Sequence, residues 1–225
     1  MTLSLGAVSL SLVGVLLAWL WRTWWQLFSL AVLAASVANV FWLDHVSVTR
    51  NSMAPTLVAG DRVLFLRDAK PRLGDIMFCQ RPGEPRRGVD PWTIGRVVGM
   101  TGDTVGTHAG NLLLNGAEQP SELLSRAVSF DDSVSRATMR LWSGTTHVAG
   151  VEHAWFRSPD KPFSISKTRV TGGMYLLGDN RLDSQDDSRD YGPIDPAACR
   201  GRVVARIWPH ATAGSVRHGW FESVH

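Results

Sequence analysis

The sequence predicts a mostly β domain preceded by an N-terminal transmembrane helical hairpin. Arg22 is the single charged residue among the first 43, whereas the rest of the chain has the composition of a soluble protein. After residue 44, short apolar runs recur between Gly and Pro residues, and no long stretch shows a helical period. With 225 residues and two cysteines, the chain is neither disordered nor a disulfide-packed miniprotein.

Two apolar segments make up the N-terminal part, residues 2–21 and 24–43. At about 1.5 Å per residue, each is just long enough to cross a hydrocarbon core of about 30 Å. We expect a turn at Arg22-Thr23, which the positive-inside rule places in the cytoplasm, with both ends of the hairpin outside. A cleaved signal peptide fits less well, because its first residues would lack Lys and Arg. Retention of only the second segment in the membrane stays open.

Residues 44–225 are expected to form one extracytoplasmic β domain. The strand candidates are DRVLFL, DIMF, TIGRVVGM, NLLLNG with its Asn-Gly turn, MYLLGDN and GRVVARIW. We expect Trp208, in the last of these, to lie in the core. Residues 120–167 are the least regular part, and we expect an inserted β-ribbon subdomain there.

Cysteine and acidic residues give no metal site. Cys79 and Cys199 fit a disulfide and two buried thiols equally well, so their pairing stays open. The acidic cluster Asp183, Asp186, Asp187 and Asp190 lacks the Gly and terminal Glu of a calcium-binding loop. We expect it to form a turn network with Arg181 and Arg189. The net charge of +3 comes from scattered residues, so nucleic acid is not an expected partner.

Ser52 begins the run SMAPTL, eight residues after the second apolar segment. Taken alone, such a serine reads as a cap or turn residue. The segments that follow it in order are GDRVLFL, RLGDIMF, IGRVVGMTGD and LLGDNRLDSQDDSRDYGPI. This order behind a membrane anchor resembles the bacterial type I signal peptidase (leader peptidase) family. The resemblance covers essentially the whole chain, and SMAPTL and GDNRLDSQDDSRDYG are its most specific parts.

The resemblance implies a membrane-bound serine endopeptidase, with no cofactor and no metal, that removes signal peptides from exported preproteins. The protein would be a multi-pass protein of the plasma (inner) membrane. Its β domain would lie on the periplasmic or extracellular side, in contact with the bilayer. Ser52 matches the nucleophile, flanked by Met53 and Pro55, and Arg96 matches a basic residue beside the general base. The residues that match the segment supporting the site are Asp179, Ser184, Asp187, Ser188 and Arg189. Residues after Ser52 and the strands DRVLFL and IGRVVGM would line apolar pockets for small side chains.

The chain departs from the family pattern at the general base. A serine hydroxyl needs a group that takes its proton, which in the bacterial family is a lysine immediately before the position of Arg96. This chain has Gly95 there, and the Arg96 guanidinium cannot act because it stays charged. The chain's three lysines are Lys70, Lys161 and Lys167, and Lys70 and Lys167 read as surface residues. In addition, Arg50 replaces an oxyanion-binding hydroxyl, and one extra residue separates Ser184 from Ser188.

These departures leave two functions in competition. The first is signal-peptide cleavage through a serine acyl-enzyme, with the base supplied from elsewhere in the chain or by a partner subunit. The second is a catalytically impaired homologue that binds signal-peptide or pilin-like clients as an assembly factor or chaperone. Loss of the lysine favours the second function. Retention of Ser52 and of the acidic segment disfavours a third possibility, a membrane-tethered domain with only a structural role.

Overall fold

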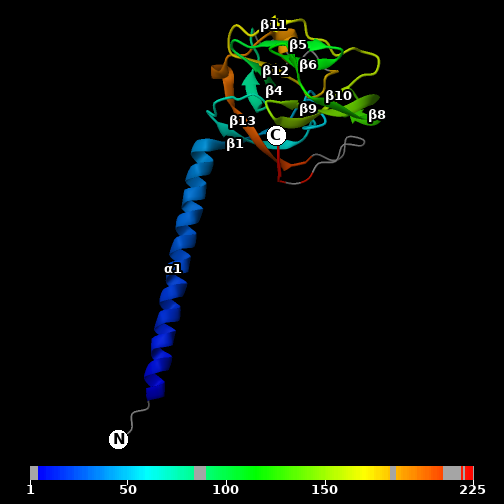
Figure 1. The fold of residues 1–225 in the computed structure, drawn as a ribbon. Helices are drawn as coiled ribbons and strands as arrows, with labels where there is room; N and C mark the ends of the chain where they lie inside the picture. Colours follow the sequence, from blue (N-terminus) through cyan, green and yellow to red (C-terminus); the bar gives the residue numbers. More distant parts are fainter. Residues whose placement is uncertain (1–4, 84–89, 183–185, 210–218, 220, 225) are drawn as a thin grey trace. The chain divides into compact units, whose positions relative to one another are not determined.

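A computed structural model describes residues 5–83, 90–182, 186–209, 219 and 221–224. The chain divides into two compact units, residues 1–43 and residues 44–225. The first unit is helical, and the regular secondary structure of the second is nearly all strand (Figure 1). The mostly β fold class predicted for the larger unit is therefore confirmed.

A single helix, α1 (Leu5–Trp42), takes the place of the predicted helical hairpin. The turn expected at Arg22-Thr23 is wrong, because the helix continues through it and the Thr23 hydroxyl donates to the Leu20 carbonyl at 2.7 Å. The junction contains neither Gly nor Pro, so nothing in it interrupts the backbone ladder. Within the part of the chain that the structure describes, no helix meets the length and hydropathy expected of a membrane span.

The main sheet is seven-stranded and holds most of the predicted strands. Its order is β1 (Leu43–Ser47), β2 (Arg62–Arg67), β13 (Cys199–Trp208), β3 (Ile76–Gln80), β4 (Trp92–Met100) and β12 (Met174–Leu177), with β14 (Glu222–Ser223) paired to β13. The pairs β2–β13, β3–β13, β3–β4 and β4–β12 are all antiparallel. The sheet therefore brings segments from both ends of the domain into one layer.

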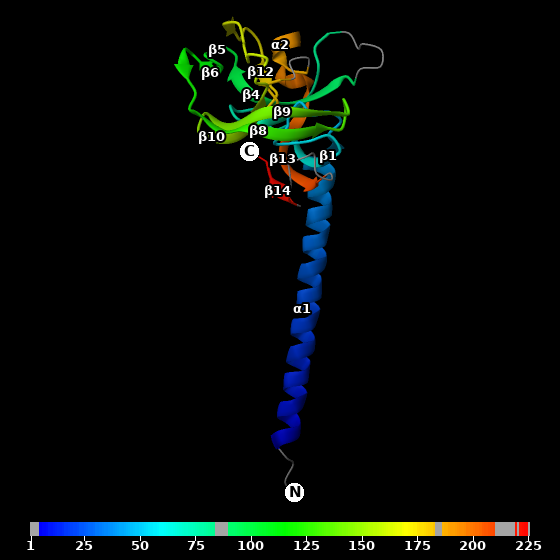
Figure 2. The same cartoon turned by 90° about the vertical axis from the view of Figure 1, so that its right-hand side faces the viewer.

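Two smaller sheets complete the domain. One contains β8 (Ser121–Asp132), β9 (Ala137–Val148) and β10 (Val151–Arg157), which run side by side in Figure 2. The other contains β11 (Thr168–Arg169), β5 (Thr104–His108), β6 (Asn111–Leu114) and β7 (Ala117–Glu118). The region 120–167 thus contributes a sheet of its own, β8–β10. A short helix α2 (Ser188–Tyr191) and a 3₁₀ turn η1 (Pro196–Ala198) lie between β12 and β13.

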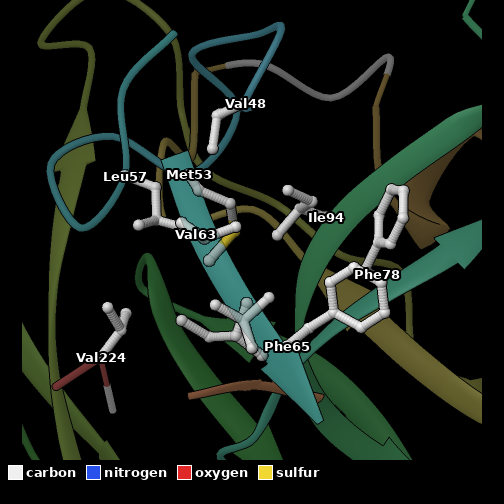
Figure 3. Packing of buried hydrophobic residues seen from close by; sticks show 10 residues of the cluster. Val48, Met53, Leu57, Val63, Phe65, Phe78, Ile94 and Val224 are labelled. Atoms are coloured by element: carbon white, nitrogen blue, oxygen red, sulfur yellow. The ribbon is translucent and has the colours of Figure 1, made fainter. Parts of the chain in front are cut away.

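One core cluster links the loop after β1 to the main sheet. Met53, from that loop, packs with Val63 and Phe65 of β2 and with Phe78 and Ile94 of the next strands, as Figure 3 shows. Met53 is fully buried, so the residue directly after Ser52 is fixed by packing. This packing places Ser52 at the edge of the core.

The fold shows whether the two cysteines pair and whether Trp208 lies in the core. A disulfide joins Cys79 to Cys199, which lie opposite each other on β3 and β13. Trp208, expected in the core, is instead 54% exposed. It is the last residue of β13, at the end of the strand, and the core prediction is wrong.

Candidate active site

Ser52 lies in the turn segment between β1 and β2 and is 4% exposed. Its carbonyl oxygen accepts a hydrogen bond from the backbone N–H of Asn180 at 3.0 Å. A Cβ atom on Gly178 would lie 2.5 Å from the same oxygen, so only glycine permits this approach. The segment after β12 is thereby held directly against the backbone of Ser52.

Beside Ser52 is a cleft with a volume of about 80 Å³. Its apolar lining comes from β1, the loop after it, β3 and β4, and comprises Val46, Val48, Met53, Phe78, Trp92 and Ile94. Its polar lining comprises Ser47, Thr49, Arg50, Ser52, Asp90, Thr93 and Asp186. Met53 and Ile94 belong to the segments predicted to line apolar pockets, and Arg50 was expected beside Ser52, whereas Asp90 and Asp186 were not expected here.

The charged groups of the cleft are tied to one another. The Asp186 carboxylate, which is 2% exposed, forms an ion pair with Arg81 and lies 3.7 Å from Nη1 of Arg50. Asp90 accepts from the Thr49 hydroxyl at 3.1 Å and from the N–H of Trp92 at 3.0 Å. Because the carboxylates of Asp186 and Asp90 already bind these partners, neither is well placed to take the proton of Ser52.

Behind Ser52, Arg96 and Asp179 form a fully buried ion pair. Arg96 Nε donates to one carboxylate oxygen at 3.0 Å and Nη2 donates to the other at 2.8 Å. The Thr56 hydroxyl also donates to this carboxylate. Burial acts to raise the pKa of Asp179, but the nearby charges, Arg96 first among them, outweigh it and hold the pKa below 3.8. The Asp179 carboxyl is therefore ionised at neutral pH.

His153, on β10, completes this buried network. Its Nε2 lies 3.8 Å from the Asp179 carboxylate and 3.2 Å from Nη2 of Arg181. Burial is the main reason that the pKa of His153 falls to about 3; the Asp179 charge opposes this, and Arg96 and Arg181 add to it. The imidazole is thus neutral and accepts from Arg181. His153 was not predicted from the sequence, because a single histidine in a segment of both polar and apolar residues does not indicate a functional site.

Four of the five predicted support residues cluster around the start of α2. Asp187 caps this helix by accepting from the N–H of Arg189 at 3.0 Å, and it also accepts from the N–H of Gly178 at 3.0 Å. The Arg189 guanidinium pairs with the same carboxylate at 2.7 Å. The Ser188 hydroxyl accepts from the buried N–H of Leu176 at 2.9 Å. Asp179 joins them through Gly178, and Ser184 lies outside the described residues.

Gly95 lies on β4 opposite Met77 of β3. A Cβ atom built there would meet the Leu176 side chain, 3.0 Å from its Cβ and 3.5 Å from Cδ1. The space that a lysine would need is thus partly taken by Leu176. Lys70, Lys161 and Lys167 are all exposed, and among the described residues that line the cleft none is a lysine or histidine.

Sequence comparison relates this chain to one family of peptidases. The profile of a family described as "Signal peptidase, peptidase S26" matches residues 21–208. Signal peptidase I of Streptococcus pneumoniae serotype 4 is 27% identical over 203 residues, which cover 85% of this chain and 95% of the relative. Mitochondrial inner membrane protease subunit 1 of Mus musculus is 42% identical over 60 residues, 27% of this chain and 36% of the relative. A crystal structure of a signal peptidase I from Enterococcus faecalis V583 aligns with 60% of this chain and 97% of its own, at 21% identity and a TM-score of 0.34.

Proposed function

The chain belongs to the signal peptidase family of serine endopeptidases, peptidase S26, and from this premise we propose that it binds the signal peptides of exported preproteins beside Ser52 and cleaves them there. The observation that carries this proposal is the cleft itself. Ser52 lies in the same small depression as six apolar side chains, at the position where the family sequence pattern has its nucleophile. The largely apolar lining of the cleft, with a few polar groups, suits an apolar side chain next to the scissile bond.

The proposed reaction is acyl transfer followed by hydrolysis. Ser52 Oγ attacks the carbonyl carbon of the scissile peptide bond, its proton passes to a base, and an ester forms as the C–N bond breaks. The leaving amine takes a proton and becomes the N-terminus of the mature protein. Water then hydrolyses the ester, which releases the signal peptide as a carboxylic acid and restores the hydroxyl.

A specific observation favours a second function, binding of signal-peptide or pilin-like clients without cleavage. Gly95 has no side chain, Leu176 occupies the space next to it, and the described cleft residues include no amine or imidazole. The apolar cleft would remain able to hold a client. A partner subunit that brings a base into the cleft would restore the first function.

We further propose a membrane location, with residues 44–225 outside the cytoplasm and the bilayer as a partner. Large apolar side chains along α1 support this, for example Leu17, Trp21, Trp24, Leu27 and Phe28, each at least 59% exposed. Exposed apolar surface on this scale is stable in lipid and unfavourable in water. The mouse relative named above is an inner membrane protease.

The test is cleavage of a purified preprotein by the detergent-solubilised full chain, read by mass spectrometry. Cleavage after a small-X-small sequence that is lost in Ser52→Ala, and kept in the exposed-serine control Ser164→Ala, supports a working peptidase. If the parent does not cleave but Gly95→Lys does, the chain is a client-binding homologue that lacks only its base. Because Leu176 crowds residue 95, the series includes Gly95→Lys with Leu176→Ala. Cleavage that survives Ser52→Ala would overturn the site assignment.

A further inference from the structure

Arg50 is the one cationic side chain among the described residues that line the cleft beside Ser52. It lies two positions before Ser52 in the chain, and both residues line the same depression of about 80 Å³. The Arg50 side chain is 31% exposed, whereas the Asp186 side chain next to it is 2% exposed. The arginine is therefore far more accessible to a peptide in the cleft than the carboxylate beside it.

The guanidinium of Arg50 has unused hydrogen-bond donors. Its one ion pair, among the residues that the structure describes, joins Nη1 to Oδ1 of Asp186 at 3.7 Å, which is too long for a hydrogen bond. Arg81 forms the closer ion pair with that same oxygen. Within the described part of the chain the Arg50 side chain donates no hydrogen bond, although a guanidinium carries five N–H groups. The surrounding protein thus uses little of the donor capacity of Arg50.

The second acid of the cleft, Asp90, has neutral donors on both of its oxygens. Oδ2 accepts from the Thr49 hydroxyl at 3.1 Å, and Oδ1 accepts from the N–H of Trp92 at 3.0 Å. No ion pair joins Asp90 to Arg50 in the described structure, so Asp90 does not occupy the guanidinium. A carboxylate that enters the cleft with a peptide would therefore find the donors of Arg50 open, and their planar fork matches a carboxylate.

The proposed cleavage creates such a carboxylate in this cleft. Before the reaction, the scissile bond of a client is a neutral amide. When water hydrolyses the ester on Ser52, the signal peptide leaves as a carboxylic acid, which loses its proton to solvent because a C-terminal carboxyl has a pKa of about 3.5. A negative charge thus appears on the peptide next to Ser52, at the end of the cleft ligand that the reaction has just released.

We propose that Arg50 binds the C-terminal carboxylate of the released signal peptide, so that the cleft holds this product more tightly than it holds the uncleaved client. The proposal rests on the proposed function, because cleavage at Ser52 is what produces the carboxylate. It makes Arg50 a product-binding residue that takes no part in bond breaking. The released peptide would then compete with the next preprotein for the cleft until it leaves or is degraded.

The experiment compares two synthetic signal peptides that end after a small-X-small sequence, one with a free C-terminal carboxylate and one with a C-terminal amide. Each carries a fluorophore at its N-terminus and is titrated with the full chain in detergent. We expect the parent to bind the acid about tenfold more tightly than the amide, because the carboxylate forms a charge-assisted hydrogen bond. Arg50→Gln should bind the two peptides equally while keeping the parental affinity for the amide, which shows that the cleft is intact.

Two further variants and a third peptide complete the design. Arg50→Lys keeps the charge and should retain part of the preference for the acid, and the exposed-arginine control Arg140→Gln should behave as the parent. The third peptide is an amide whose last residue is aspartate, and we expect it to bind like the neutral amide. If it binds like the acid, the cleft takes a side-chain carboxylate and the assignment to the released C-terminus is wrong.

The parent alone tests the proposal, even if Arg50→Gln does not fold. Equal affinity of the parent for the acid and the amide would overturn the role of Arg50 and leave the cleft as a client site. A preference for the acid that persists in Arg50→Gln would also overturn it, because another group would then bind the carboxylate. Failure of both peptides to bind would overturn the proposed function together with this inference.

Discussion

The two sides of Ser52 differ in how their charges are partnered. Behind it, Arg96, Asp179, His153 and Thr56 form a network in which the Arg96–Asp179 pair is fully buried and joined by two hydrogen bonds, whereas the buried Nδ1 of His153 has no hydrogen-bond partner. In front of it, the cleft holds Arg50, Asp90 and Asp186 but, among its described lining residues, no lysine or histidine. The buried Arg96–Asp179 pair is thus present although the position of the base carries only Gly95.

From this difference we infer that the acidic segment has a structural role in the folded domain. Removing either member of a buried ion pair leaves an uncompensated charge in the core, which is costly whether or not the protein cleaves anything. Retention of Asp179 and Arg96 is therefore evidence for the fold more than for catalysis. The cleft residues and position 95 carry the information about function.

The largest expected effect comes from breaking the network behind Ser52. Arg96→Met should lower the free energy of unfolding by about 3–5 kcal/mol, because it leaves the Asp179 carboxylate buried without its main partner. The control is Arg202→Met, which removes a partly exposed pair with Asp75 at 3.5 Å and should cost at most about 1 kcal/mol. Denaturant unfolding measures both. Equal losses in the two variants would contradict the contrast between buried and exposed pairs.

The second effect is a dependence of stability on pH that comes from His153. Its pKa is about 3 in the folded protein against 6.5 as the ordinary value, so the unfolded chain binds the extra proton between these values. Stability is thus fully present above pH 6.5 and falls as the pH drops toward 3, by at most about 1.4 kcal/mol per pH unit. Unfolding measured from pH 7 to pH 4.5 should show this slope.

The matching variant is His153→Gln, which should flatten the slope between pH 6.5 and 4.5. The control His108→Gln removes a histidine whose side chain is 75% exposed and should leave the slope unchanged. Should His153→Gln keep the parental slope, a different group would be responsible for the loss of stability in acid.

A smaller effect is expected at the vacant base position. Gly95→Ala should destabilise by about 1–3 kcal/mol, because the new Cβ must displace Leu176 within a packed layer. Gly172→Ala is the control, since a Cβ there would meet nothing within 4 Å, and it should change stability by no more than about 0.5 kcal/mol. Thermal unfolding distinguishes them. A Gly95→Ala variant as stable as the parent would mean that the space beside Leu176 is open to a lysine.

Strands and motifs were predictable to different degrees. The runs DRVLFL, DIMF, TIGRVVGM and GRVVARIW overlap β2, β3, β4 and β13, because apolar residues between Gly-rich turns are a strong signal for buried strands. The cap and ion pairs made by Asp187 lie close in sequence and follow the expected turn network. The single helix α1 was not predicted, because hydropathy does not distinguish a two-residue turn at Arg22-Thr23 from a continuous helix.

A β-ribbon was expected over residues 120–167, but the strands of β8–β10 and the long-range contacts of the site could not be predicted. β8 is exposed along most of its length, so its sequence lacks the alternation that indicates a strand. His153 reaches Asp179 only through the pairing of β10 with β9 and the contact of Phe156 with Asn180, which join residues far apart in the chain. Likewise, Asp186 meets Arg50 and Arg81 across more than a hundred residues. Short-range patterns carry no information about such contacts.

The most direct test of the account is whether the cleft beside Ser52 receives a signal peptide, because both candidate functions require it. Binding of a fluorescent signal peptide to the full chain would be compared with that of Ile94→Trp, which fills the cleft, and of Val134→Trp, which adds the same side chain at a site that is 55% exposed. We predict at least tenfold weaker binding for Ile94→Trp, about 1.4 kcal/mol, and parental binding for Val134→Trp. Equal affinity in a folded Ile94→Trp variant would contradict the assignment of this cleft as the client-binding site.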